Sequence, residues 1–186
     1  MDVRATAIPE VRILRPKRFG DGRGFFSEVY NRRAFADVGI ELDFVQDNQS
    51  WSALAGTLRG MHFQKPPAAQ AKLVRVLRGR ILDVVVDCRH GSPSHGRHVM
   101  VELDAERGEQ IFCPHGFAHG FLTLEPDTEV LYKVDAHYAP DLDGGIRWDD
   151  SELAIPWPLP VGELILSDRD RTLPRFSELP VIFTYP

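Results

Sequence analysis

The sequence predicts an all-β domain of the barrel or jelly-roll class, with a few short helices at its periphery. Glycine and proline contribute 15 and 14 of the 186 residues. They recur at intervals of roughly 8 to 12 residues, the spacing of turns in all-β sandwiches and barrels. Short β-branched and aromatic runs lie between them, and neither a solenoid-length repeat nor a heptad pattern is present. One domain over residues 1–186 is therefore expected.

The first part of the chain alternates strands with glycine-rich and amide-rich segments. Val11–Leu14 and Phe25–Tyr30 are expected strands, and the glycines between residues 19 and 24 form either a hairpin or a phosphate cradle. Asn31–Val38 is expected to form one short helix with a capping asparagine. Phe44–Ser50 is dense in amides and is either a strand with a polar inner face or a loop.

The clearest strands lie in the middle of the chain: Leu73–Leu77, Ile81–Asp87, Val99–Leu103 and Gln110–Cys113. Residues 128–134 alternate, so Thr128, Val130, Tyr132 and Val134 share one face of a further strand. Tyr132 is therefore expected on a regular β surface that fixes its ring. The segment 164–171 is expected to be a last strand, ending in alternating charges.

Composition excludes several classes of partner. The formal net charge is -5 and no long basic run is present, which argues against nucleic acid or an anionic membrane as the main partner. No run approaches 18 apolar residues, and residues 1–11 lack a signal-peptide pattern, so a cytoplasmic location is expected. Cys88 and Cys113 are too few for a disulfide framework and are expected to be buried thiols.

Two segments each place a histidine shortly after a glycine, beside apolar residues. They are Gly56–Gln64, which contains His62, and Pro114–Phe121, which contains His119. A strand reaching into a barrel presents an imidazole in this way, so both histidines are expected to face one cavity.

The two segments invite comparison with metal-binding cupins. Pro114, Gly116 and His119 match the spacing of the cupin motif P-x-G-x-x-H. In the other cupin motif the second histidine of H-x-H is replaced by Gln64, and no well-placed glutamate follows. A first-row metal ion needs three or four imidazole or carboxylate donors, so the comparison supports the fold and argues against a metal site.

The remaining polar residues suit proton abstraction next to a carbonyl group. An imidazole such as His62 accepts a proton near neutral pH, and a carboxylate bonded to its other nitrogen holds the tautomer. Lys72 supplies positive charge where an enolate oxygen would form, and the phenol of Tyr132 can return a proton. Asp168 and Asp170 are both candidates for the carboxylate, because spacing does not separate them.

Several motifs stand in the same order as in one known family: Asp21–Glu28, Gln46–Asn48, Leu58–Gln64, Gln70–Val74, Pro114–Phe121 and Tyr132–Lys133. Through these motifs the chain resembles the dTDP-4-dehydrorhamnose 3,5-epimerase family over nearly its whole length. The resemblance implies a cupin-type jelly roll, a homodimer with exchanged N-terminal strands, and no metal or redox cofactor. It also implies the substrate dTDP-4-dehydro-6-deoxy-D-glucose, epimerised at C3 and C5 to dTDP-4-dehydro-L-rhamnose.

The resemblance also implies individual roles. His62 is similar to the general base, Asp170 to its carboxylate partner, Lys72 to the enolate stabiliser and Tyr132 to the acid on the opposite face. Tyr138 matches an aromatic residue that stacks on thymine. Arg23 and Glu28 would serve the site of the neighbouring subunit, and Asp143 and Arg169 stand where the family is expected to have glutamate and lysine. The positions that match nucleotide or sugar contacts are Arg23, Glu28, Gln46, Asn48, Arg59, His119, Tyr138, Asp143 and Arg169.

Three alternatives to the double epimerase stay open from the sequence. The first is a 3-epimerase that inverts one carbon of a dTDP-4-keto-6-deoxysugar in another deoxysugar pathway. The second is a sugar-nucleotide binder without catalysis, which the presence of both His62 and Tyr132 disfavours. The third is a metal-dependent cupin oxygenase, which the missing second histidine disfavours.

Overall fold

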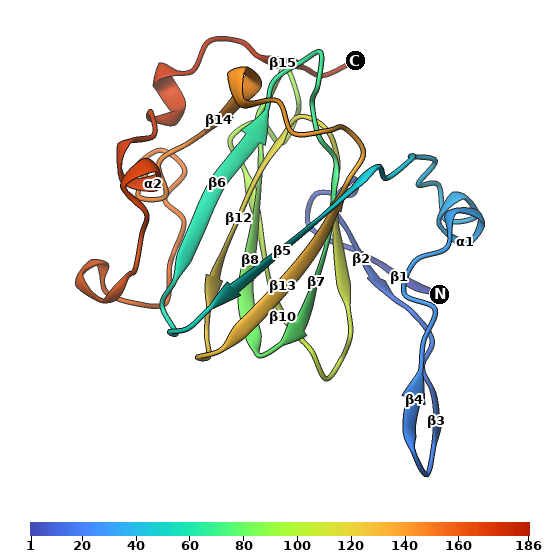
Figure 1. The fold of residues 1–186 in the computed structure, drawn as a ribbon. Helices are drawn as coiled ribbons and strands as arrows, with labels where there is room; N and C mark the ends of the chain where they lie inside the picture. Colours follow the sequence, from blue (N-terminus) through green and yellow to red (C-terminus); the bar gives the residue numbers. More distant parts are fainter.

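Two antiparallel sheets face each other in the computed structural model, which describes residues 1–186 apart from the side chain of Val161 (Figure 1). The six-stranded sheet has the order β1 (Asp2–Ala5), β2 (Arg12–Arg15), β11 (Gln110–Cys113), β7 (Lys72–Arg78), β13 (Thr128–Val134) and β5 (Gln46–Ser52). The five-stranded sheet has the order β10 (His98–Asp104), β8 (Arg80–Asp87), β12 (Phe117–Thr123), β6 (Leu58–Gln64) and β14 (Asp143–Gly145). The expected all-β, cupin-type jelly roll is confirmed.

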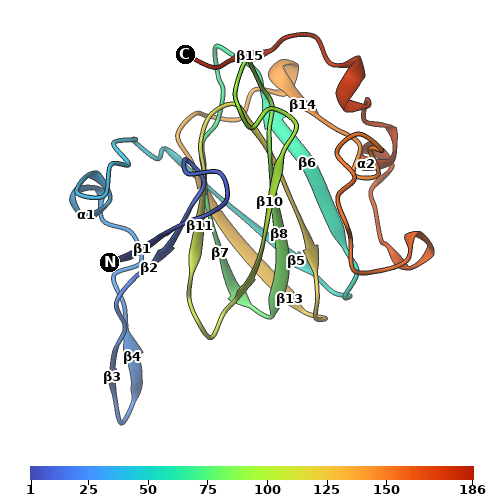
Figure 2. The same cartoon turned by 180° about the vertical axis from the view of Figure 1, so that it is seen from behind.

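The core explains why the run at residues 81–86 is almost wholly apolar. Val85 belongs to the cluster between the two sheets, whereas its neighbours Val84 and Val86 pack under the C-terminal segment. Successive residues of a strand point to opposite faces, so β8 is buried on both sides. Ile146 and Phe176 are among the residues that cover this outer face, where the C-terminal segment crosses the five-stranded sheet (Figure 2).

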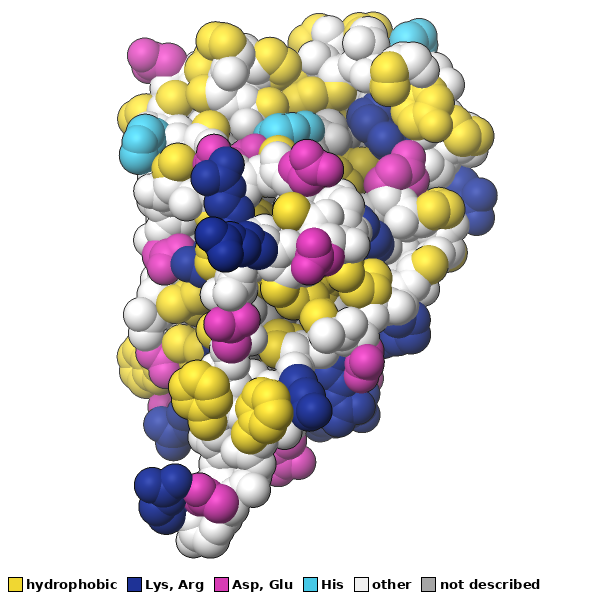
Figure 3. Space-filling view, turned by 90° about the vertical axis from the view of Figure 1, so that its right-hand side faces the viewer, with side chains coloured by type: hydrophobic (Ala, Val, Ile, Leu, Met, Phe, Trp, Pro, Cys, Tyr) yellow, Lys and Arg dark blue, Asp and Glu magenta, His cyan; other side chains and the backbone are white. Residues whose placement is uncertain are grey.

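The glycine-rich segment forms a hairpin that projects away from both sheets (Figures 1 and 2). Its strands are β3 (Phe19–Asp21) and β4 (Gly24–Phe26), and Gly24 has a positive φ of 132° that suits the tight turn. The expected strand Phe25–Tyr30 therefore stops at Phe26. Phe19, Phe25 and Phe26 are 54%, 59% and 69% exposed. In Figure 3 large hydrophobic side chains lie on the protruding part, just above a tip that carries basic and acidic side chains.

Short helical elements lie at the periphery, as expected. Asn31 caps α1 (Arg32–Ala36) by accepting hydrogen bonds from the backbone N–H groups of Arg33 and Ala34. The other elements are three 3-10 turns, η1 (Pro140–Leu142), η2 (Val161–Glu163) and η3 (Phe176–Glu178), the helix α2 (Asp168–Thr172), and a parallel pair, β9 (Arg89–His90) with β15 (Phe183–Thr184).

The expected strand at residues 164–171 is wrong. Ile165 makes a single bridge to Thr57, and α2 follows at once. Ser167 ends the extended chain because its hydroxyl accepts a hydrogen bond from the backbone N–H of Asp170 at 3.1 Å. Serine at this position favours a helix start, and acidic residues in the first turn complement the helix dipole.

Two further expectations concern the amide-rich segment and the N-terminus. Phe44–Ser50 resolves into a strand, β5, that begins at Gln46 and pairs with β13 along its whole length. β1 pairs with β2, and β2 pairs with β11 of the same chain, so exchange of N-terminal strands between subunits stays a prediction. None of the helices that the structure describes has the length and apolar character needed to span a bilayer.

Candidate active site

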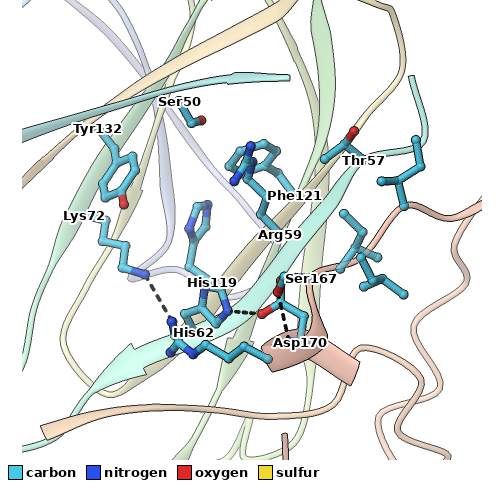
Figure 4. A pocket seen from close by; sticks show the side chains of 14 residues that line it. Ser50, Thr57, Arg59, His62, Lys72, His119, Phe121, Tyr132, Ser167 and Asp170 are labelled. Carbon is cyan, nitrogen blue, oxygen red and sulfur yellow. Dashed lines mark hydrogen bonds and ion pairs between the residues drawn. The ribbon is translucent and has the colours of Figure 1, made fainter. Parts of the chain in front are cut away.

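A cavity of about 510 Å³ opens between the two sheets, on the side of β5 and β6 (Figure 4). The six-stranded sheet contributes Lys72 and Tyr132, and the five-stranded sheet contributes His62 and His119. The segment around α2 closes one wall. A smaller cavity of about 180 Å³ adjoins it and shares four lining residues, which are His62, Lys72, Tyr132 and Arg169.

A β-bulge in β6 brings Arg59 and His62 to the same cavity. Residues three apart in a regular strand point to opposite faces. Here His62 pairs with His119 and Arg59 with Phe121, so β6 uses one more residue than β12 between these two pairs. Gly60 provides the close approach, because a Cβ built on it would lie 2.5 Å from the Cα of Gly120.

His62 forms a dyad with Asp170 from α2. The Nε2 of His62 lies 2.5 Å from Oδ1 of Asp170, whose side chain is almost fully buried. Burial lowers the pKa of His62 and outweighs the opposing effect of Asp170, which favours the neutral imidazole. Burial alone would raise the pKa of Asp170, but hydrogen bonds, the one with His62 foremost, lower it overall and keep the carboxylate ionised.

Lys72 begins β7 and is buried behind the dyad. Its Nζ donates a hydrogen bond to the backbone carbonyl of His62 at 3.1 Å, which directs the amine toward the histidine (Figure 4). Burial lowers the pKa of Lys72. A buried amine with one backbone partner retains donors for a further oxygen atom in the cavity.

Tyr132 approaches from the opposite wall. It lies on β13 between Val74 of β7 and Asn48 of β5, so the sheet fixes its ring as the alternating pattern predicted. Burial raises the pKa of Tyr132 above its ordinary value, which keeps the phenol protonated at neutral pH. Figure 4 shows the Tyr132 hydroxyl and the Lys72 amine directed into the same space.

His119 has a buried carboxylate partner, Asp83, that the sequence interpretation missed. The Nε2 of His119 lies 2.8 Å from Oδ2 of Asp83, and both side chains are buried. His119 pairs with Val85 on β8, so Asp83 lies two residues away on the same face. The available signal was an isolated aspartate inside an apolar strand, because an aspartate is rarely buried without a partner.

The smaller cavity gathers several of the predicted contact residues. Asp143 lies 2.6 Å from the guanidinium of Arg169 and accepts a hydrogen bond from the Tyr138 hydroxyl at 3.3 Å. The two positions that depart from the family pattern therefore form one ion pair. Gln46 donates to Oδ1 of Asn48 at 2.8 Å, and both line this cavity with Tyr138.

Arg23 and Glu28 lie on or next to the projecting hairpin. The described side chains that line the two cavities include neither residue. Arg23 is exposed and pairs with Asp21 at 2.5 Å. Of the predicted site residues, these two alone are left outside the cavities. Over the described residues, no group of three or more His, Cys, Asp or Glu side chains is arranged to hold a metal ion.

Comparisons with known proteins agree over almost the full chain. Residues 5–178 match the family model described as dTDP-4-dehydrorhamnose 3,5-epimerase. The curated enzyme of that name from Sinorhizobium fredii is 48% identical over 185 residues, covering 100% of this chain and 94% of the relative.

Two solved structures of similar proteins extend this likeness to the fold. The enzyme from Bacillus anthracis, with TDP and pyrophosphate bound, has a TM-score of 0.91 and 50% identity, covering 94% of this chain and 98% of the other. The dTDP-6-deoxy-D-glucose-3,5-epimerase from Legionella pneumophila, in complex with dTDP-4-keto-L-rhamnose, has a TM-score of 0.94 and 39% identity, covering 100% and 98%. This chain belongs to the dTDP-4-dehydrorhamnose 3,5-epimerase family.

Proposed function

We propose that this protein is an isomerase that epimerises dTDP-4-dehydro-6-deoxy-D-glucose at C3 and C5, giving dTDP-4-dehydro-L-rhamnose. One observation carries the proposal. His62 and Tyr132 enter one cavity from opposing sheets, and Lys72 points into the space between them. A base and an acid on opposite sides of a sugar ring are what inversion at carbon requires.

Proton abstraction falls to His62 in this mechanism. The C4 ketone acidifies the hydrogens on C3 and C5. The Nε2 of His62 carries a proton that it shares with Asp170, so the lone pair on Nδ1 is free to take a proton from C3 or C5 of the sugar. The electron pair of the broken C–H bond moves onto the ketone oxygen, and the ammonium group of Lys72 stabilises the enolate.

Tyr132 then returns a proton from the other side. Its raised pKa keeps the phenol protonated until a carbanion-like carbon is in reach. Protonation on the face opposite to abstraction inverts the centre, and repetition at the second carbon completes the double epimerisation. His62 passes its proton to solvent and Tyr132 regains one between the two steps, so the protein returns to its starting state.

The nucleotide is bound by the cationic and aromatic residues around the two cavities. The guanidinium groups of Arg59 and Arg169 suit a pyrophosphate, because their planar donors match phosphate oxygens. Arg59 reaches the cavity with its Nε near the Ser52 hydroxyl at 3.4 Å, which orients the head group. Tyr138 offers an exposed ring against which a base can stack.

A homodimer completes the site in this proposal. The projecting hairpin exposes three phenylalanines, and monomeric proteins rarely leave such apolar groups in water. A second copy of the chain covers them. The hairpin then carries Arg23 and Glu28 to the cavity of the neighbouring subunit, which accounts for their distance from the cavity of their own chain.

Deuterium exchange tests the reaction. In deuterated water the purified enzyme should introduce deuterium at both C3 and C5 of the 4-keto substrate, as read by NMR or mass spectrometry. Retention of hydrogen at C5 would instead identify a 3-epimerase. His62→Asn should abolish both exchanges and keep dTDP affinity, whereas His98→Asn, on the edge strand β10, should change neither.

Mixed dimers test the hairpin. Arg23→Ala and His62→Asn are each expected to be inactive as homodimers. If Arg23 serves the partner site, random mixing gives hybrids with one complete site each, and about a quarter of wild-type activity returns. If no activity returns although hybrid dimers form, the hairpin does not act in the neighbouring site.

A further inference from the structure

Three glutamine side chains hold the backbone of four consecutive residues between β13 and η1. Gln46 comes from β5, Gln64 from β6, and Gln70 from the connection before β7. All three line the smaller cavity. The hydrogen bonds run from Gln70 Nε2 to Ala136 O at 2.8 Å, from Gln64 Nε2 to His137 O at 3.0 Å, from Tyr138 N to Gln46 Oε1 at 3.0 Å, and from Ala139 N to Gln64 Oε1 at 2.8 Å.

Gln64 is the centre of this arrangement. It is 3% exposed, and its amide also donates to the carbonyl of Ala68 at 2.5 Å. Two donated bonds and one accepted bond use both ends of the side chain. Only a primary amide can do this, because a carboxylate lacks the donors and an imidazole has at most one of each when neutral. The amide that replaces a cupin metal ligand therefore has a structural use of its own.

The segment held in this way carries Tyr138. Tyr138 is 56% exposed, and its hydroxyl makes one long hydrogen bond to Asp143. Packing therefore contributes little to the position of the ring. Gln64 bonds to the residues on either side of Tyr138, and Gln46 bonds to the N–H of Tyr138 itself, so the backbone fixes where the ring stands.

We propose that Gln64, supported by Gln46 and Gln70, is a positioning residue that holds Tyr138 ready to stack on the nucleoside base. This role of Gln64 rests on the proposed function, in which Tyr138 stacks on the thymine of a dTDP-sugar. Gln64 thus sets the affinity for the nucleoside diphosphate half of the substrate and takes no part in proton transfer. Gln46, expected from the sequence as a substrate contact, is assigned to the support of Tyr138.

The strand β6 carries residues for both proton abstraction and nucleotide binding. His62 and Gln64 lie two residues apart, and Gln64 pairs in register with Asp143 of β14, the acceptor of the Tyr138 hydroxyl. One strand therefore carries the base for the sugar and, one step further, the support for the nucleotide. Loss of the support should affect binding while the dyad at His62 and Asp170 stays in place.

The test compares Gln64→Ala with wild type by equilibrium binding of dTDP alone and by steady-state kinetics. Affinity for dTDP should fall about tenfold, within the range for loss of one base–aromatic stack. KM should rise in parallel, while kcat at saturation stays within about twofold of wild type. Gln49→Ala removes the same side chain from the opposite, exposed face of β5 and should change none of these values.

A double-mutant cycle with Tyr138→Ala tests whether Gln64 affects dTDP binding through Tyr138. If Gln64 acts through Tyr138, Gln64→Ala weakens dTDP binding in wild type and adds nothing in the Tyr138→Ala background. Equal weakening in both backgrounds, or a fall in kcat at unchanged affinity, overturns the proposal. If Gln64→Ala does not fold, Gln70→Ala removes a half-buried part of the same support and is read in the same way.

The binding measurement separates this proposal from the proposed function. Wild-type protein that fails to bind dTDP contradicts the function itself. Wild-type protein that binds dTDP and turns over substrate, with Gln64→Ala and Gln70→Ala binding equally well, contradicts only the role of the glutamines.

Discussion

Replacing Asp170 with asparagine tests the catalytic dyad most directly. The carboxylate lies 2.5 Å from Nε2 of His62, is nearly fully buried and fixes the tautomer that leaves Nδ1 basic. An asparagine can present its N–H₂ to Nε2, which moves the ring proton to Nδ1 and removes the base. We expect kcat to fall about 10²- to 10⁴-fold, the contribution of one general base, or about 3–5 kcal/mol of barrier.

The pH profile of the Asp170→Asn variant gives a second, independent readout. His62 must be neutral to accept a proton, so kcat/KM falls as the pH drops through the pKa of His62, which burial places below the ordinary value near 6.5. Asp170 raises that pKa. Its removal should therefore move the acid limb of the residual activity to lower pH.

Asp168 provides the matched control, because it lies on the same short helix and its side chain is exposed. Asp168→Asn should keep both kcat and the position of the acid limb. An Asp170→Asn enzyme with normal kcat, or an acid limb displaced to higher pH, would refute the assignment of the dyad. Stopped assays on the purified enzymes between pH 4 and 9 are sufficient.

Three further changes probe the acid, the bulge and a distant ion pair. Tyr132→Phe keeps the ring and should lower kcat by about 10²- to 10⁴-fold at unchanged melting temperature; a large loss of stability would show that the hydroxyl is structural. Gly60→Ala places a Cβ 2.5 Å from the Cα of Gly120 at a φ of 145°, so we expect lost stability and lost activity together, measured by denaturant titration and rate. Asp87→Asn removes the carboxylate that Arg89 contacts at 2.7 Å while Glu10 remains a partner at 3.0 Å, so it should cost about 1–3 kcal/mol of unfolding free energy at near-normal kcat. Burial alone would raise the pKa of Asp87, but its hydrogen bonds, led by that from Arg89, lower it overall, so its stabilising contribution should be present above the ordinary pKa and be lost as the pH falls below it.

The local sequence pattern was sufficient to predict the structure where the role of a residue depended on which face of a strand it occupies. The alternation at residues 128–134 placed Tyr132 on a regular β surface, and residues 81–87 were expected to form a strand; both are confirmed. The two histidine segments were likewise expected to face one cavity, and His62 and His119 line it as cross-strand partners.

Prediction failed where tertiary contacts decided the outcome. In a strand Asp168 and Asp170 would share a face, so spacing could not separate them; in the helix α2 residues two apart point in different directions, and only Asp170 reaches His62. The helix itself was missed because the apolar residues before Ser167 resemble a strand. Asp83 was missed because strand pairing, which no local pattern states, brings it to His119.

The dyad also constrains when the molecule can become active during folding. Its two partners are separated by 108 positions along the chain, with most strands of both sheets between them. A contact of such long range forms late, since the intervening polypeptide must be ordered first. During synthesis on the ribosome, His62 is made long before Asp170, so the dyad forms only after the C-terminal segment has been added. Recovery of turnover after dilution from denaturant should therefore lag behind the β-sheet circular dichroism signal.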